Sequence, residues 1–273
     1  MHDTFFFTDI HGNLNLYNSI MKYINEQDSE ACIVYGGDAC DRGDNGLAII
    51  TSLLNDPRVV YIKGNHEDMF IDSAETMYPI ITKRTDIDWS SREQTKAAIS
   101  KMALIDGNIY NHVANGGLET LISWICDYNY DMEIIDNLKN LTLIFSYENL
   151  DFCHAGGTPQ TFERISKAYY NKIHVNQRDK THVLWDRSSF KIGWTPNRMC
   201  VHGHTPTPFL PKHYLDEDIK NGMIHPITYY GNFYKNLSGG KIDMDTGTAN
   251  TGIIYLLNCT TMEMHKFKDN KEE

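Results

Sequence analysis

The stretch that decides the fold of this chain reads Gly36-Gly37-Asp38-Ala39-Cys40-Asp41-Arg42-Gly43. It follows an apolar run, residues 31–35, and precedes a segment of helical character that starts near Asn45. Two carboxylates, a guanidinium and three glycines therefore stand directly behind a predicted buried strand. In α/β proteins, sites are built at this place, outside the carboxyl ends of the strands. The stretch thus predicts an α/β fold with a charged site at a strand end.

Two other segments share this layout of an apolar run followed by a polar loop. Residues 4–8 are rich in aromatic side chains and lead into a loop at residues 9–13, and residues 59–63 lead into a loop at residues 64–68. Between the runs, apolar residues recur at helical spacing in residues 14–24, and a second helix is expected over residues 46–54. This alternation predicts right-handed βαβ units and a largely parallel sheet.

The second half of the chain consists mainly of predicted strands joined by short turns. Its strand candidates are residues 141–146, 150–153, 183–185, 199–201, 241–244, 252–257 and 262–267. Residues 69–139, with predicted helices at 92–104, 118–127 and 132–138, are interpreted as a helical cap inserted after the third strand. We predict the α/β class with a two-sheet β-sandwich flanked by helices. The length allows two small domains, but we expect a single domain over residues 1–273, with a Tyr-rich insertion at residues 208–240.

Composition excludes several classes of protein. With 41% hydrophobic and 22% charged residues the chain is typical of soluble proteins, and no segment reaches the ~20 apolar residues of a membrane span. Phe5-Phe6-Phe7 is too short for the apolar core of a signal peptide. A net charge of −11 argues against binding to a nucleic acid backbone. Six widely spaced cysteines without a Cys-x-x-Cys pair indicate a reducing compartment, so we expect a cytoplasmic protein without membrane or nucleic acid partners.

The polar residues at the predicted strand ends form a single set. Its members are Asp9, His11, Asp38, Asp41, Arg42, Asn65, His66, His154, Arg187 and His204. Carboxylate and carboxamide oxygens mixed with imidazoles suit Mn(II), Fe or Zn(II) better than thiolates would. Two metal ions need more than four ligands and one shared acid, and Asp38 is the natural bridge because it is central in the series.

Other histidines are weaker candidates. His202 could compete with His204 as a ligand, and we rank it as a supporting residue. The remaining seven are interpreted as surface or hydrogen-bonded residues: His2, His112, His174, His182, His213, His225 and His265.

These motifs resemble a known family. Asp-x-His-Gly at residues 9–12, Gly-Asp-x-x-Asp-Arg-Gly at 37–43 and Gly-Asn-His-Glu at 64–67 are similar to motifs of the calcineurin-like metallophosphoesterases. Within that superfamily the chain resembles the phosphoprotein phosphatase branch, which includes small bacterial and phage serine/threonine phosphatases. Later matches follow in the family order, at residues 154–156, 185–187, 203–206 and 245–247. The resemblance therefore spans residues 8–247.

The resemblance implies a role for each residue of the set. Asp9, His11 and Asp38 would hold a first divalent metal ion, and Asp38, Asn65, His154 and His204 a second. Mn(II) is the expected metal, with Fe and Zn as alternatives. Arg42, Asn65 and Arg187 would bind the phosphoryl oxygens, and His66, paired with Asp41, would protonate the leaving oxygen. Glu67 would support the loop. A hydroxide bridging the metals would attack phosphorus directly in line, with no phosphoenzyme.

We therefore predict a phosphomonoester hydrolase whose substrate is a phosphorylated protein, on serine or threonine, or a small phosphoester. One alternative is hydrolysis of a dinucleoside tetraphosphate or another small nucleotide. The intact Asp41-Arg42-Gly43 favours a phosphatase over this alternative. Another alternative is a non-catalytic scaffold, but such proteins usually lack a ligand or an arginine, and none is missing here. The sequence leaves the native metal pair, serine/threonine versus tyrosine preference and oligomeric state open.

Overall fold

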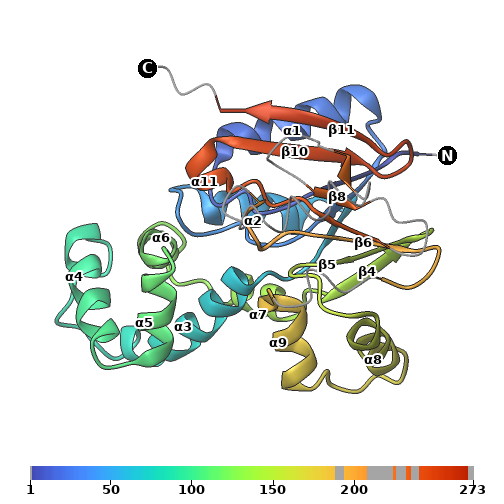
Figure 1. Ribbon diagram of the computed structural model, residues 1–273. Coiled ribbons are helices and arrows are strands. Elements are labelled where there is room, and N and C mark those ends of the chain that lie inside the picture. The colour runs from blue at the N-terminus through green and yellow to red at the C-terminus, as the bar shows by residue number, and fades with distance from the viewer. Residues whose placement is uncertain (1, 188–193, 208–223, 226–231, 235–239, 270–273) are drawn as a thin grey trace.

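Two β-sheets form the centre of the computed structural model, which describes residues 2–187, 194–207, 224–225, 232–234 and 240–269 (Figure 1). The first sheet has the strand order β11-β10-β1-β2-β3. Its strands are β1 (Thr4–Phe7), β2 (Cys32–Tyr35), β3 (Val59–Tyr61), β10 (Ile253–Asn258) and β11 (Glu263–Lys268). β1, β2 and β3 run parallel, and β10 and β11 add an antiparallel edge.

The second sheet has the order β4-β5-β6-β9-β8-β7. Its strands are β4 (Ile144–Tyr147), β5 (Leu150–Cys153), β6 (Met199–His202), β7 (Ile224–His225), β8 (Asn232–Tyr234) and β9 (Gly240–Asp243). β5, β6 and β9 run parallel to one another, as β1, β2 and β3 do in the first sheet. The loops that follow these strands carry the candidate site residues.

The sheets pack through alternating side chains of their strands. Phe5 and Phe7 of β1 face a core on the helix side, whereas Phe6 faces the second sheet and stacks on Phe152 with ring centroids 5.3 Å apart. This alternation is the period of two expected of a strand buried on both faces. Burying one such side chain stabilises the fold by about 1.5–3 kcal/mol. The three phenylalanines of β1 therefore pack the first sheet against the helices on one face and against the second sheet on the other.

Ten helices of the described residues surround the sheets. They are α1 (Leu14–Gln27), α2 (Gly46–Asn55), α3 (Asn65–Ile81), α4 (Arg92–Ala103), α5 (Gly107–Ala114), α6 (Leu118–Cys126), α7 (Met132–Lys139), α8 (Pro159–Tyr170), α9 (Gln177–Trp185) and α11 (Thr248–Thr251). Figure 1 shows α4, α5 and α6 grouped away from the sheets. Within the described ranges, no helix combines the length and apolar character needed to cross a membrane.

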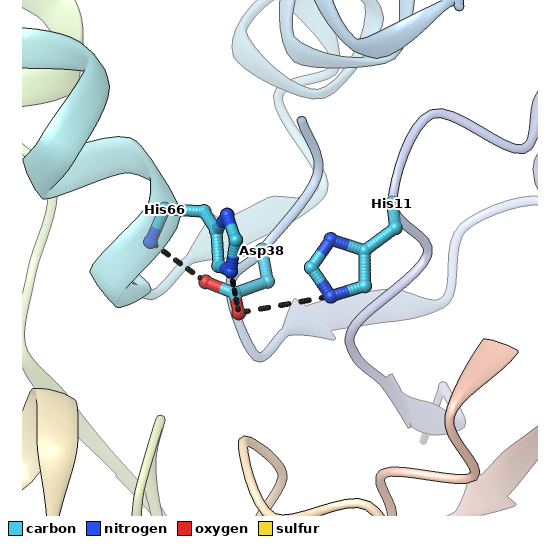
Figure 2. A group of neighbouring side chains, drawn as sticks. All are labelled: His11, Asp38 and His66. Atoms are coloured by element: carbon cyan, nitrogen blue, oxygen red, sulfur yellow. Dashed lines mark hydrogen bonds and ion pairs between the residues drawn. The ribbon is translucent and has the colours of Figure 1, made fainter. Parts of the chain in front are cut away.

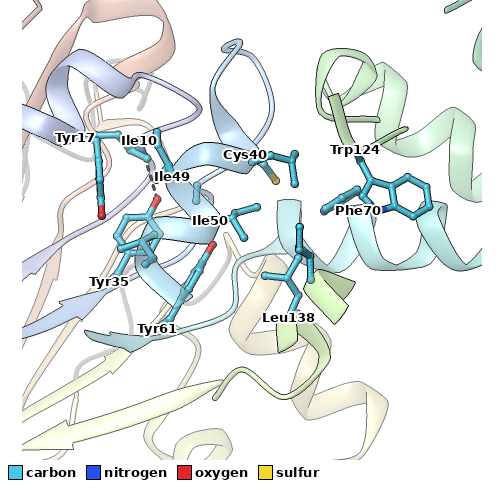
Figure 3. Close-up of a cluster of buried hydrophobic side chains, with 14 of the residues drawn as sticks. Ile10, Tyr17, Tyr35, Cys40, Ile49, Ile50, Tyr61, Phe70, Trp124 and Leu138 are labelled. Carbon is cyan, nitrogen blue, oxygen red and sulfur yellow. Dashed lines mark hydrogen bonds between the residues drawn. The ribbon is translucent and has the colours of Figure 1, made fainter. Parts of the chain in front are cut away.

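One core connects the first sheet to the helices that follow it. Figure 3 shows this cluster, which runs from Tyr35 and Tyr61 of the sheet to Phe70 of α3 and Trp124 of α6. The rings of Phe70 and Trp124 meet edge to face with centroids 6.0 Å apart. Packing of this kind fixes α3, α5 and α6 against the loops at the end of the first sheet.

The predicted two-sheet sandwich flanked by helices is confirmed. The helical region begins at Asn65, earlier than residue 69, so Asn65 and His66 lie in the first turn of α3. The division into one domain with two insertions stays a prediction, and most of residues 208–240 lie outside the described residues. The strand predicted at residues 183–185 is wrong. These residues form the last turn of α9, because a three-residue apolar run does not distinguish a strand from the buried face of a helix.

Candidate functional site

The candidate site is built from loops with unusual backbone conformations. Six of its residues have left-handed φ angles: Asp9 (56°), His11 (46°), Asp38 (61°), Asp41 (68°), Arg42 (64°) and His204 (71°). Left-handed φ is unfavourable for residues with a side chain, and such residues cluster at functional sites where their surroundings fix them. The loops fix one another here, because the backbone N–H groups of residues 9, 11 and 12 donate to the carbonyls of Gly37, Asp38 and Ala39.

Two glycines allow these loops to approach closely. A Cβ atom at Gly64 would overlap Asp38 Oδ1, and one at Gly203 would overlap Asp9 Oδ2. Only a residue without a side chain fits where a carboxylate lies against the backbone. The glycines at these two positions therefore set the spacing between the candidate ligands.

Asp38 lies at the centre of three imidazoles. Its Oδ2 is 3.9 Å from His11 Nε2 and 3.8 Å from His66 Nε2, as Figure 2 shows. Its Oδ1 is 3.3 Å from His154 Nε2 and accepts a hydrogen bond from the His66 backbone N–H at 3.0 Å. All four side chains are almost fully buried. Asp38 thus directs Oδ2 toward His11 and His66 and Oδ1 toward His154.

The backbone sets which nitrogen of two of these rings faces the centre. His11 Nδ1 lies 2.9 Å from the carbonyl oxygen of Cys40, and His154 Nδ1 lies 2.8 Å from that of Gly36. A carbonyl oxygen only accepts, so each Nδ1 carries the proton and donates. The Nε2 atoms of both rings are left facing Asp38. Metal-ligating histidines are commonly oriented in this way by a second hydrogen bond.

Two groups of side chains could hold a metal ion, and Asp38 belongs to both. Within each group the ligand atoms lie within 4.8 Å of one another: His11, Asp38 and His66 in the first, and Asp38, His154 and His204 in the second. Asn65 Oδ1 is 2.8 Å from His154 Nε2 and 2.8 Å from His204 Nδ1, which places the carboxamide beside the second group. The mixed oxygen and imidazole donors suit a first-row divalent ion.

A buried nitrogen without a hydrogen-bond partner and two crowded carboxylates also indicate a place for metal ions. His204 Nε2 is buried and has no hydrogen-bond partner among the described residues. Burial and the neighbouring carboxylate of Asp245 raise the pKa of Asp9 well above its ordinary value, and burial raises the pKa of Asp245 to about 6. Crowded buried carboxylates of this kind are stabilised by nearby cations. The residues present therefore fit a centre of divalent metal ions.

Asp9 has a position of its own at this centre. Its carboxylate accepts hydrogen bonds from Thr8 Oγ1 at 2.6 Å and from the His204 backbone N–H at 3.2 Å. The first three-residue group contains His66 rather than Asp9. Asp9 thus borders the expected ligands, and its role as a ligand stays a prediction.

The two arginines approach the centre differently. Arg42 Nη1 is 2.6 Å from His11 Nε2, and Nη2 is 3.0 Å from His66 Nε2. Arg187 is exposed and is one of the groups that lower the pKa of His204, after burial and His154. Arg42 therefore borders the centre directly, while Arg187 supplies positive charge near its second half.

His66 and Asp41 form a hydrogen-bonded pair next to Arg42. His66 Nδ1 lies 2.6 Å from Asp41 Oδ2. Burial opposes a charge on the His66 ring, but Asp38 and Asp41 outweigh burial and raise its pKa above the ordinary value. An imidazole held by a carboxylate in this way is suited to donate a proton from its other nitrogen.

Sequence reasoning missed two residues that contact Asp41. His112, interpreted as a surface or hydrogen-bonded residue, is fully buried, and its Nε2 lies 3.0 Å from Asp41 Oδ1. Thr120 Oγ1 donates to the same oxygen at 2.6 Å. Neither residue stands at the end of a strand, so the pattern that identified the other site residues does not find them. Their contact with Asp41 depends on how α5 and α6 pack.

Glu67 and His202, the two residues expected to support the site, are both buried. Glu67 accepts hydrogen bonds from the backbone N–H groups of Asp38, Ala39 and Gly64 at 2.7–2.9 Å, so it supports the loop that carries Asp38. His202 is buried and lies outside both metal-binding groups. Burial, followed by the positive charge of Lys241, lowers the pKa of His202 to about 3.

Comparisons with known proteins agree with this geometry. A family model described as calcineurin-like phosphoesterase matches residues 3–216. None of the curated proteins matches the sequence significantly. Among solved structures, a putative diadenosine tetraphosphatase superimposes with a TM-score of 0.57 at 13% identity, over 98% of this chain and 93% of that one.

Two phosphatases share the fold as well. A cold-active protein-tyrosine phosphatase of a psychrophilic Shewanella species has a TM-score of 0.50 at 16% identity, over 98% of this chain and 81% of that one. A serine/threonine protein phosphatase from Saccharomyces cerevisiae has a TM-score of 0.50 at 11% identity, over 100% of this chain and 81% of that one. Identities this low show a shared fold and do not select one substrate.

Proposed function

This chain belongs to the calcineurin-like phosphoesterase family, and from that premise we propose that it is a metal-dependent phosphomonoesterase acting on phosphoserine or phosphothreonine in proteins. The observation that carries the proposal is the position of Arg42. Its guanidinium lies between the imidazoles of His11 and His66, at the edge of the candidate metal centre. A planar guanidinium at this place can bind two oxygens of a phosphoryl group.

Eight residues are proposed to share the binding of metals and phosphate. Asp9, His11, Asp38, Asn65, His154 and His204 would hold two divalent ions, for which Mn(II) is the proposed metal, and Arg187 with Arg42 and Asn65 would hold the phosphoryl oxygens. The ions, when bound, supply Lewis acidity and lower the pKa of water toward ~7. The arginines offset the negative charge of the three equatorial oxygens during transfer.

His66 is proposed to protonate the leaving oxygen. Its Nδ1 is held by Asp41 at 2.6 Å, which leaves Nε2 directed toward the carboxylate of Asp38, 3.8 Å away. As the ester P–O bond breaks, the proton on Nε2 passes to the oxygen that departs. Acid assistance of this kind contributes about 10²- to 10⁴-fold to the rate.

A cavity beside the centre supports a phosphomonoester over a polyphosphate. It has a volume of about 380 Å³, and its described lining includes His11, Arg42, Asn13, Asn15, Asp44, Asn45 and Asp269. Arg42 is the only cation among these residues, and it is engaged at the metal centre. The additional phosphates of a dinucleoside tetraphosphate would be repelled here by the carboxylates of Asp44 and Asp269, which disfavours such a substrate. A peptide bearing neutral or basic side chains meets no such repulsion.

The test is hydrolysis of p-nitrophenyl phosphate with and without added Mn(II). Wild type, Asp38→Asn and the control Asp86→Asn are compared, since Asp86 is an exposed residue between α3 and α4. We expect metal-dependent turnover in the wild type and the control, and a loss of at least about 100-fold in Asp38→Asn. Equal, metal-insensitive rates in all three proteins would refute the proposal. Metal analysis showing fewer than two ions at saturation would favour a scaffold.

The alternative substrate class is tested side by side. One solved structure that shares the fold is described as a putative diadenosine tetraphosphatase, which is why this nucleotide is the comparison. We expect phosphoserine and phosphothreonine peptides to be turned over faster than diadenosine tetraphosphate. Turnover of the nucleotide with peptides untouched would overturn the substrate class while leaving the phosphoesterase activity in place.

A further inference from the structure

The helices α5 and α6 hold the loop of Asp41 and Arg42 from outside the sheets. Arg42 N donates to the carbonyl oxygen of Gly116 at 3.1 Å, and Asp41 N donates to Thr120 Oγ1 at 3.1 Å. Both loop residues have left-handed φ angles, 68° and 64°, which need support from their surroundings. The conformation of this loop therefore depends on a segment more than 70 residues further along the chain.

The carboxylate of Asp41 accepts hydrogen bonds from three side chains. His66 Nδ1 lies 2.6 Å from Oδ2, Thr120 Oγ1 lies 2.6 Å from Oδ1, and His112 Nε2 spans both oxygens at 3.0 and 3.1 Å. An ionised carboxylate only accepts, so Nε2 of His112 carries a proton and donates. His112 Nδ1 is buried without a partner among the described residues, so the polar contact of this ring is directed to Asp41.

The surroundings of His112 fix the rotation of its ring. A Cβ atom at Gly117 would overlap His112 Cδ2 and Nε2, so the ring lies directly on the glycine backbone. On another side the ring of Phe70 packs against it, with centroids 5.9 Å apart. His112 is 0% exposed, so water does not compete for Nε2. The donor is thus held in one orientation toward Asp41.

We propose that His112 is a positioning residue for the acid that protonates the leaving group, an inference that rests on the proposed function. Its Nε2–H fixes the rotation of the Asp41 carboxylate about the Cβ–Cγ bond, so that Oδ2 stays on His66 Nδ1. Without this donor only Thr120 holds the side of the carboxylate away from His66, so the carboxylate turns more freely and the His66 ring loses its alignment with the departing oxygen. His112 acts through Asp41 and does not touch the substrate. The helical segment α5–α6 is therefore part of the catalytic apparatus.

Four variants separate this role from a general loss of structure. His112→Leu replaces the donor with an apolar side chain that still fills the buried position, whereas His112→Gln keeps an N–H donor that reaches nearly as far as Nε2. Gly117→Ala displaces the His112 ring without changing any residue that contacts Asp41 through its side chain. Ile109→Ala is the matched control, because Ile109 is 0% exposed and lies on α5 one turn before His112.

The kinetic readout compares phenyl phosphate, a poor leaving group, with p-nitrophenyl phosphate, a good one. For His112→Leu and Gly117→Ala we expect kcat to fall about tenfold more on phenyl phosphate, because the acid matters most there, with KM little changed. His112→Gln should recover to within about threefold of wild type, and Ile109→Ala should lower both rates equally. The same ratio of the two rates in His112→Leu and wild type would overturn the proposal.

A spectroscopic readout does not depend on turnover. In metal-free protein at a fixed pH, the Nδ1–H proton of His66 is observed by ¹H–¹⁵N NMR. We expect its resonance to shift or broaden in folded His112→Leu and to return in His112→Gln. If the wild type hydrolyses neither ester, the proposed function fails. The NMR measurement still shows whether His112 orients the His66 ring through Asp41. An unchanged His66 resonance in folded His112→Leu would overturn the inference.

Discussion

Glu67 supports the loop of Asp38, and replacing it with glutamine should destabilise the fold measurably. Its Oε2 accepts from Asp38 N at 2.9 Å and Gly64 N at 2.8 Å, and its Oε1 accepts from Ala39 N at 2.7 Å and the Tyr61 hydroxyl at 3.0 Å. A glutamine has one oxygen, which can take the place of Oε2. Its NH₂ group then faces Ala39 N, while the Tyr61 hydroxyl can rotate to accept.

The size of the loss follows from this count of hydrogen bonds. One buried N–H without an acceptor costs about 1–3 kcal/mol, and two bonds to a neutral instead of a charged acceptor weaken by about 1 kcal/mol each. Burial, and after it the charge of Asp38, raises the pKa of Glu67, so removing its charge returns part of this energy. We expect Glu67→Gln to lower the free energy of unfolding by roughly 2–4 kcal/mol.

Urea unfolding of metal-free protein, followed by circular dichroism, measures this loss. Glu75→Gln is the control, since Glu75 lies on the same helix α3 and forms an exposed ion pair with Lys139. Such pairs contribute no more than about 1 kcal/mol. A midpoint for Glu67→Gln equal to that of Glu75→Gln, with an unchanged slope, would refute the reasoning.

Three other changes have defined outcomes. Asp41→Asn should slow phenyl phosphate about tenfold more than p-nitrophenyl phosphate, because the carboxylate that orients His66 loses its charge, and steady-state kinetics showing equal losses would contradict that role. Mn(II) at about 100 times its Kd should stabilise the protein by ~2.7 kcal/mol for each ion bound, measured by thermal unfolding, and an identical gain in Asp38→Asn would exclude Asp38 as ligand. A hydrogen bond from Arg164 lowers the pKa of Asp179 in the folded protein. The ionised carboxylate therefore stabilises the fold fully at pH values above its unfolded-state pKa of about 3.9. This stabilisation is lost as the pH falls through the lower folded-state pKa. Asp179→Asn should therefore destabilise at pH 7 and progressively less as the pH is lowered below about 3.9 in urea unfolding, and the same destabilisation at every pH would argue against the ion pair.

Local patterns in the sequence were enough to predict the layers of the fold. Apolar runs such as Phe5-Phe6-Phe7 identify strands buried on both faces, and helical spacing between them requires crossovers on the outside. The three-residue run at residues 183–185 failed because its pattern is too short to have a period. A strand that is buried on both faces is recognised from a continuous run of apolar residues in the sequence. Its partner strands need not be known.

The sequence by itself determined the chemical types at the strand ends, because polar loops behind buried strands are local features. From these alone Asp38, flanked in order by histidines on both sides, could be singled out as the centre. The tertiary structure decided which oxygen of Asp38 faces which ring, and it brought His112 and Thr120 onto Asp41 across 71 and 79 positions of the chain. No local pattern encodes such contacts, because they depend on how helices α5 and α6 pack against helices α2 and α3.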